Sequence, residues 1–353
     1  MSFASNSTGT LGPSSCTLAG TATVGLASCS VGYTPAVTGH HAITGTYGGD
    51  STHPGALGSA TLTVAQTPPY ALVVSYDGRV FKYYQNGTMT QVGKPVGSPL
   101  RQVAWKPDGS YALMVGDQGV ILKYDGTVIT RIATGFSATP NFNTVAWRPD
   151  GSYALIGGSG GILVRYDGLS VTQIPDPSTN TIHSISWNPN GNTALAVGDK
   201  GTTLLYQTTS QISILSSGTS QPLFTVVWNP NGLYALAGGG HGAVLKYDGA
   251  AFSSLNITGL TPINKNLRFI SFSPTGTIAV IAGDSGLLWT YDGIKLASLS
   301  SGTSQNLYSI SWFQGTAYIV GQHGTILSWS GSVVNKLTSS TSSDLGGIAW
   351  KPT

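Results

Sequence analysis

The side chains best suited to bind a ligand occupy one recurring position, four residues before an aromatic residue that returns about every 40 residues. This position holds Arg101, Asn143, His183, Phe224, Arg268, Tyr308 and Gly346. Cationic, amide, imidazole and aromatic groups gathered at one opening could hold an anionic or sugar-like ligand by charge-assisted hydrogen bonds and stacking. The alternative is that these residues are solvated loop ends that bind nothing.

Short glycine turns carry a second set of polar residues. His241 and His323 occupy equivalent places in two such turns, and both are candidate ligand-binding residues. A whole repeat unit separates the two units that carry them, so we predict no metal site. Asp117, Asp199 and Asp284 begin equivalent turns. Because aspartate favours turns by itself, these three are predicted to be structural.

The sequence gives catalysis little support. It has no phosphate-binding glycine loop followed by Lys-Ser or Lys-Thr, no His-Glu-x-x-His motif, and no glutamate. We therefore predict no catalytic residues, no enzyme activity and no cofactor. The alternative is an extracytoplasmic hydrolase or lyase acting on polysaccharide, with a pair of aspartates brought together from different repeat units.

The recurring aromatic residue belongs to a repeated unit. It is found at Trp105, Trp147, Trp187, Trp228, Phe272, Trp312 and Trp350. Each unit alternates apolar and polar residues with a period of two, and turns such as Pro-Asp-Gly and Tyr-Asp-Gly divide it into four short strands. Four strands in a repeat of about 40 residues predict the blades of a β-propeller.

The ends of the repeat predict a closed ring. The first unit has strands at 70–74, 79–84 and 88–92 with no innermost strand before them, whereas the chain ends in a lone innermost strand at 347–353. Pairing these strands completes seven four-stranded blades and removes the sheet edges that an open ring would expose. The predicted fold class is all-β, with a seven-bladed β-propeller over 67–353 whose first blade is closed by the C-terminal strand.

The start of each unit, as in the Val-Ala-Trp-Arg-Pro-Asp-Gly segment at 145–151, and the later Tyr166-Asp167 pair resemble WD40-like and YVTN-like propeller repeats. Tyr-Asp stands where Trp-Asp would be. We name the strands of a blade a to d from the innermost outward. In propellers of this pattern the d–a connections and b–c turns share one face. The d–a connections at 134–143, 175–183 and 256–268 vary in length, so this is the predicted binding face.

The first 66 residues do not show the repeat and have a different sequence pattern. Short strand-like stretches alternate with Gly, Ser and Thr turns, and the segments at 33–35 and 46–52 resemble the Big-type immunoglobulin-like repeats of prokaryotic surface proteins. The resemblance implies a partial immunoglobulin-like β-sandwich over 1–66, because about five strands are present where about seven are needed. Three explanations stay open: a piece of a longer protein, a repeat that folds with fewer strands, or a gap filled by a strand donated by another molecule.

The two cysteines of the chain, Cys16 and Cys29, lie in this segment, thirteen residues apart. We expect a disulfide between them, and two buried reduced thiols are the alternative. Closing a loop of this size stabilises a domain by about 3 kcal/mol in the chain-entropy model.

Composition restricts the class of protein. Charged residues make up 8% of the chain, against about a quarter in most proteins, and the net charge is +3. The cations are scattered singly, so we predict no nucleic-acid binding. No apolar run of about 20 residues is present, so we predict no membrane insertion. A surface whose solubility depends on hydroxyls and amides favours an extracellular or cell-surface location. Any signal peptide would lie outside this sequence.

These observations together predict a binding and scaffold protein acting in adhesion, surface-layer or filament assembly. Its partners would be other protein subunits or surface glycans, bound on the d–a face of the propeller. A strand exchanged head to tail through the N-terminal domain would produce filaments.

Overall fold

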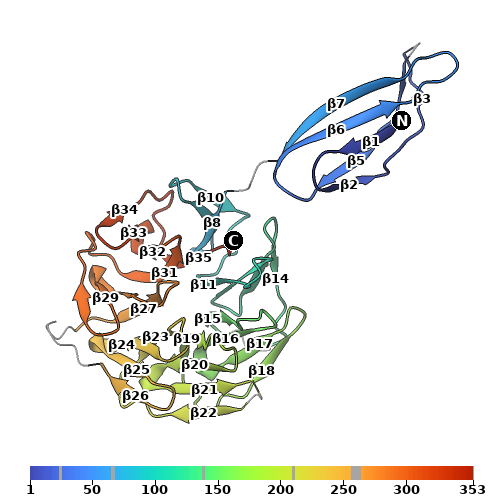
Figure 1. Ribbon diagram of the computed structural model, residues 1–353. Coiled ribbons are helices and arrows are strands. Elements are labelled where there is room, and N and C mark those ends of the chain that lie inside the picture. Colours follow the sequence, from blue (N-terminus) through green and yellow to red (C-terminus); the bar gives the residue numbers. More distant parts are fainter. Residues whose placement is uncertain (24–25, 65–67, 137–139, 209–210, 256–263, 353) are drawn as a thin grey trace. The chain divides into compact units, whose positions relative to one another are not determined.

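The computed structural model describes the chain except for residues 24–25, 65–67, 137–139, 209–210, 256–263 and 353. The chain divides into two compact units, Met1–Pro68 and Pro69–Thr353 (Figure 1). The sequence predicts this division after residue 66. The helical segments in the described part of the chain are 3-10 turns of three residues, and all other regular elements are strands. The chain is all-β, as predicted.

Seven four-stranded antiparallel sheets form the blades of the second unit, which confirms the predicted propeller. The first three blades consist of β35 (Leu345–Trp350), β8 (Tyr70–Ser75), β9 (Val80–Tyr84) and β10 (Met89–Val92); β11 (Leu100–Trp105), β12 (Ala112–Gly116), β13 (Ile121–Tyr124) and β14 (Ile129–Arg131); and β15 (Phe142–Trp147), β16 (Ala154–Gly158), β17 (Leu163–Tyr166) and β18 (Val171–Ile174).

The other four blades follow in chain order. They consist of β19 (Ile182–Trp187), β20 (Thr193–Gly198), β21 (Thr203–Gln207) and β22 (Ile212–Leu215); β23 (Leu223–Trp228), β24 (Ala235–Gly239), β25 (Val244–Tyr247) and β26 (Phe252–Ser254); β27 (Leu267–Phe272), β28 (Ala279–Gly283), β29 (Leu288–Tyr291) and β30 (Leu296–Ser298); and β31 (Leu307–Phe313), β32 (Thr316–Gly321), β33 (Ile326–Trp329) and β34 (Val334–Lys336).

The C-terminal strand closes the ring as predicted. β35 pairs antiparallel with β8, with Gly347 opposite Val74 and Ile348 opposite Val73. Figure 1 shows the red β35 beside the teal β8, so the two ends of the repeat meet in one blade. The first blade thereby has the same four strands as the other six.

The core lies between neighbouring blades. The second strand of a blade is covered on both faces, which is why it is a continuous apolar run such as Ala154-Leu155-Ile156 with every residue buried. The outermost strand has one face in solvent and is polar, as in Phe252–Ser254. Burial therefore falls from the centre of the ring to its rim, and the ring gives the central strands a rigid frame.

The Tyr-Asp-Gly segments form the c–d turns. The hydroxyl of Tyr166 donates to the carbonyl oxygen of Gly168 at 2.9 Å, and Tyr247 and Tyr291 make the same bond two residues ahead, at 2.9 and 2.8 Å. Asp167 accepts hydrogen bonds from the backbone N–H groups of Leu169 and Ser170. A phenol reaches the turn carbonyl and a carboxylate caps the turn, which explains the repeated Tyr-Asp pair.

Buried tyrosines predict unfolding at alkaline pH. Burial raises the pKa of Tyr70, Tyr83 and Tyr111 from 10.0 to about 12. A pKa that is higher in the folded state gives stability that is complete below pH 10 and is lost as the pH rises from 10 towards 12. We expect the melting temperature to fall steeply in this window, together with the phenolate absorbance change. A melting temperature that stays constant to pH 12 would contradict the expectation.

The first unit has three small sheets. β1 (Ser2–Ser5), β6 (Gly39–Tyr47) and β7 (Ala56–Val64) form one, β2 (Gly9–Gly12) and β5 (Gly32–Pro35) another, and β3 (Ala19–Gly20) and β4 (Ala27–Ser28) the third. The expected disulfide joins Cys16 and Cys29, whose Cα atoms are 6.0 Å apart. Among the described residues of this unit, only His41 and Gly45 are buried. The unit therefore has almost no apolar core.

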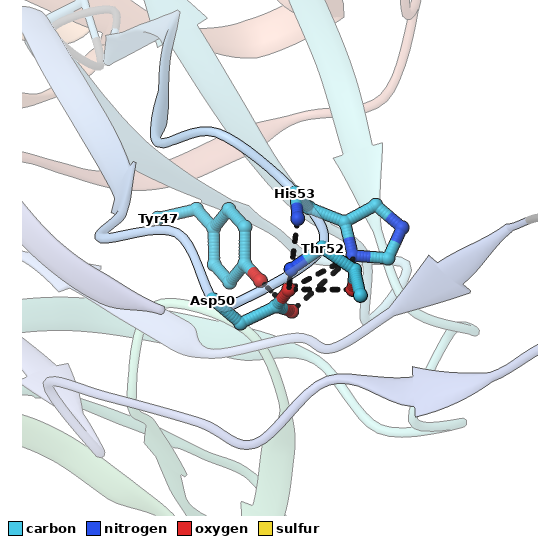
Figure 2. Close-up of polar contacts among 4 residues, drawn as sticks. All are labelled: Tyr47, Asp50, Thr52 and His53. Atoms are coloured by element: carbon cyan, nitrogen blue, oxygen red, sulfur yellow. Dashed lines mark hydrogen bonds and ion pairs between the residues drawn. The ribbon is translucent and has the colours of Figure 1, made fainter.

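The loop between β6 and β7 is organised by Asp50 (Figure 2). One carboxylate oxygen accepts hydrogen bonds from the backbone N–H groups of Thr52 and His53 at 2.8 and 2.9 Å, and the hydroxyl of Tyr47 donates to the other oxygen. The Tyr47 hydrogen bond, followed by those from Thr52, holds the pKa of Asp50 well below its usual value. These contacts form an exposed turn, which accounts for the conspicuous Tyr-Gly-Gly-Asp-Ser-Thr segment without a ligand.

Candidate functional site

The innermost strand of every blade contains a β-bulge at the position singled out in the sequence. In each blade the register shifts across one residue, and the bulged residues are Arg101, Asn143, His183, Phe224, Arg268, Tyr308 and Gly346. The residue before each bulge is a fully buried Leu, Ile or Phe, such as Leu100 and Phe142. The buried residue anchors the strand, and the bulge turns the next side chain towards the channel.

These seven residues line one cavity of about 130 Å³ together with Tyr76, Gln102, Ser184 and Phe269. We call it the mouth cavity. Its seven predicted residues come from seven different blades and are brought together by ring closure. The cavity is smaller than the roughly 300 to 1,000 Å³ of pockets that enclose a drug-sized ligand.

The ionisable groups of the mouth cavity are paired with turn aspartates. Arg101 makes a two-pronged hydrogen bond to Asp117 at 2.5 and 3.1 Å. Arg268 makes the same bond to Asp284 at 2.7 and 3.3 Å. The Nε2 atom of His183 lies 2.7 Å from a carboxylate oxygen of Asp199. In all three pairs the aspartate follows its partner by sixteen residues, at the b–c turn of the same blade.

Asp117, Asp199 and Asp284 therefore hold mouth residues in place in addition to occupying their turns. They also change the electrostatics expected of the site. Two guanidinium groups and one imidazole face three carboxylates, so the mouth cavity has no excess positive charge. The aspartates do not line the cavity themselves, but their charge offsets that of the two arginines. The paired arginines keep further N–H groups that can donate to a neutral acceptor.

Aromatic rings separate the charged pairs. The rings of Tyr76 and Tyr308 lie 5.6 Å apart, and the guanidinium of Arg101 lies 5.8 Å from the Tyr76 ring. On the other side, the guanidinium of Arg268 lies 4.9 Å from the centroid of the Phe224 ring. The centroids of the Phe224 and His183 rings are 5.3 Å apart. Ring faces beside hydrogen-bonding groups are the combination that binds the apolar face and the hydroxyls of a sugar.

Tyr76 is the main residue that the sequence interpretation missed. It begins the b–c turn of the first blade, the place that Asp117 occupies in the second. Burial raises the pKa of its phenol, which stays protonated and able to donate. Gly346 leaves room for this ring, since a Cβ there would lie 3.1 Å from Tyr76 and 2.7 Å from the carbonyl oxygen of Leu100. The turn position could have revealed it, because the equivalent turns also supply the aspartates.

His241 and His323 lie outside the mouth cavity. Both occupy the middle of a b–c turn with positive φ, 54° and 52°, and both side chains are exposed. The Nδ1 atoms lie 2.8 Å from the side-chain oxygens of Gln221 and Gln305. The two histidines therefore mark the rim of the predicted face and do not join the other candidates.

Neither a metal centre nor a serine nucleophile emerges from the described residues. No group of three or more His, Cys, Asp or Glu side chains that could hold a metal occurs among them. The pattern Gly-x-Ser-x-Gly is present at 157–161, but Ser159 lies in a turn between antiparallel strands, and its hydroxyl accepts the N–H of Asn141 at 3.0 Å. Two long d–a connections include residues 137–139 and 256–263, which are outside the described part.

Comparison with known proteins identifies the fold alone. No protein-family model matches the chain, and no curated protein matches its sequence. Among solved structures, the chain is similar to the β-propeller domain of Cps50 (Swd1) from Myceliophteria thermophila, with a TM-score of 0.57 and 14% identity over 71% of this chain and 89% of that one. None of the helical segments in the described part of the chain is long and apolar enough to cross a membrane.

Proposed function

We propose that the protein is an extracellular or cell-surface binding scaffold whose propeller takes a neutral sugar unit, or a polar group of a protein subunit, into the mouth cavity. The observation that carries the proposal is the contrast between neighbouring positions of the repeat. The buried anchor before each bulge is always Leu, Ile or Phe, whereas the bulged residue differs in nearly every blade. Packing explains the repeated positions, and ligand recognition explains the varied ones.

The chemistry of the cavity supports a neutral glycan over an anion. The two arginines and His183 are each paired with an aspartate, so they supply no excess positive charge that would favour an anion, and the lining holds both hydrogen-bond donors and acceptors. A sugar hydroxyl both donates and accepts, and so satisfies both kinds of group. Phe224, Tyr76 and Tyr308 supply ring faces for the C–H side of the sugar.

A low charge content and the Cys16–Cys29 disulfide support the extracellular location. The propeller acts in this proposal as a binding module without catalysis. The His183–Asp199 pair is the one observation that favours a hydrolase or lyase acting on polysaccharide, because a carboxylate-oriented imidazole can act as a base. Such an enzyme would lose turnover on substitution of Asp199 with asparagine.

A glycan array read alongside a product assay tests both functions. We expect the purified chain to bind neutral glycans without releasing products. Phe224→Ala should weaken binding about tenfold through lost stacking. Arg268→Lys should weaken it comparably, because lysine cannot keep the two-pronged bond to Asp284 while donating to the ligand. The control is Arg131→Lys, an exposed arginine on β14. Equal binding by all variants would contradict the proposed site.

The N-terminal unit has a separate part in the proposal. We infer that Met1–Pro68 is an immunoglobulin-like unit that accepts a strand from another molecule and so links copies or subunits in adhesion, a surface layer or a filament. The near absence of buried residues supports this, as does β7, whose nine residues pair with β6 alone in the described part and contain no charge or proline to block pairing. Sedimentation at rising concentration should reveal assembly that is lost when residues 1–68 are removed. Monomers at every concentration would refute the linkage.

A further inference from the structure

Neighbouring blades are joined by an aromatic contact at four of the seven junctions of the ring. A tyrosine at the start of the second strand stands edge-on to the recurring aromatic of the next blade. The ring centroids are 5.9 Å apart for Tyr70 and Trp105, 5.3 Å for Tyr111 and Trp147, 5.5 Å for Tyr153 and Trp187, and 5.7 Å for Tyr234 and Phe272. Such edge-to-face pairs add to the apolar burial between blades.

The a–b turns add a second contact between neighbouring blades, a hydrogen bond. The residue after the recurring aromatic donates to the carbonyl oxygen of the turn glycine in the next blade. Asn188 reaches Gly232 at 3.2 Å, and Asn229 reaches Gly276 at 2.9 Å. Arg148 makes the equivalent bond to Gly191 at 2.9 Å. Each of these turns therefore covers the junction with the blade before it.

Neither the aromatic contact nor the hydrogen bond is present between the sixth and seventh blades. Ile278 stands where the tyrosine would be. The a–b turn of the seventh blade is two residues shorter, because Ala317 follows Trp312 by five positions whereas Ala154 follows Trp147 by seven. Its glycine, Gly315, has no neighbouring atom within 4 Å of an added Cβ. The hydroxyl of Ser273, which would bridge to this turn, instead accepts the N–H of Ile278 in its own turn at 3.3 Å.

Without these two contacts, the junction between the sixth and seventh blades contains an apolar pocket of about 500 Å³. Trp312 and Trp329 form its aromatic walls, and Ile278 and Pro274 contribute aliphatic surface. The other recurring aromatics are 6 to 8% exposed, whereas Trp312 is only partly buried. No lining residue carries a charge. The pocket is built from a–b and c–d turns, at the opposite ends of the strands from the mouth cavity.

We propose that this junction pocket binds an uncharged aromatic side chain, tyrosine or phenylalanine, presented by a protein partner. The ring itself shows what fits such a junction, because at four other junctions a tyrosine ring lies against the residue equivalent to Trp312. An aromatic residue of the partner would restore that contact. The uncharged lining matches a neutral ring and disfavours charged side chains, which would lose hydration without gaining a counter-charge.

The test uses N-acetyltyrosinamide as the probe and the full chain as the protein. Saturation-transfer NMR should detect binding in the low-millimolar range, with N-acetylserinamide showing none. Ile278→Tyr would fill the pocket with the chain's own ring, abolish probe binding and raise the melting temperature. Ile294→Tyr is the matched control, since Ile294 is 89% exposed on the c–d turn of the sixth blade, and it should bind the probe like the native chain.

Two results would overturn the proposal. One is the absence of saturation transfer to the native chain at millimolar probe. The other is undiminished binding by Ile278→Tyr, which would place the probe elsewhere. If that variant is unstable, Trp312→Phe gives the second reading, because it narrows the aromatic wall and should reduce binding several-fold. Glycan binding at the mouth cavity should be unchanged in each variant, so failure here leaves the proposed function standing.

Discussion

A chain that ends at Asp344, and so lacks β35, will fail to form the native propeller. β35 supplies three large buried side chains, Leu345, Ile348 and Trp350, and all its residues except the bulged Gly346 pair with β8. Losing a buried Leu, Ile or Trp costs about 2 to 5 kcal/mol each, and a domain of this kind has about 5 to 15 kcal/mol in total. The deletion also exposes the inner edge of β8 to other chains. We expect loss of the near-ultraviolet circular dichroism and of cooperative melting.

Two controls accompany this truncation. A chain that starts at Pro69 should keep the melting transition of the propeller, because the second unit has its own core. A synthetic peptide covering 345–353 should restore part of the signal when added to the truncated chain, since it offers the missing strand. A truncated chain that melts at the native temperature would show that β35 is not needed for closure.

The second large effect is expected from the disulfide. Replacing Cys16 and Cys29 with serine should destabilise Met1–Pro68 by about 3 kcal/mol, by the loop-closure argument. With only His41 and Gly45 buried among its described residues, the unit has little apolar burial to offset this loss. We therefore expect the first unit to unfold at room temperature while the propeller stays folded.

Limited proteolysis measures this effect directly. Cleavage within residues 1–68 should accelerate by about two orders of magnitude, as 3 kcal/mol implies when opening precedes cleavage. Cleavage within the propeller, measured in the same digest, is the internal control. Equal protection of the first unit in the native and doubly substituted chains would mean that something other than the disulfide holds it together.

The propeller could be predicted because the same packing and turn residues recur in each blade. A recurring aromatic, such as Trp147, and fixed turn residues reveal the blades, and the unpaired ends at 70 and 347 reveal how they close. The mouth residues were predictable for the opposite reason. Within a strict repeat, a position that changes in almost every copy is not explained by packing. The bulges that aim these side chains leave no mark in the sequence, since a single extra residue in a strand does not disturb its alternation visibly.

The contacts among the mouth residues were not predictable. Arg101 lies on the first strand of a hairpin and Asp117, sixteen residues later, directly follows the second strand, so whether they meet depends on the register across the bulge. The aspartates were assigned to turns because their local chemistry suffices for that role. The contact of Tyr76 with Tyr308 depends on ring closure, which joins residues from the two ends of the repeat. The sequence left an anionic and a sugar-like ligand open, and it did not reveal that each arginine is paired with an aspartate.

The most direct test of the account is the footprint of a bound neutral oligosaccharide, measured by hydrogen–deuterium exchange on the full chain with a glycan selected from the array. The account predicts slower exchange at the starts of β11, β19, β23, β27 and β31, where the bulged residues line the mouth cavity, with no change in the outermost strands. Phe224→Ala should remove this protection. Protection confined to the outer strands or to Met1–Pro68, with the mouth unchanged, would contradict the claim that the non-repeating positions of the ring bind the ligand.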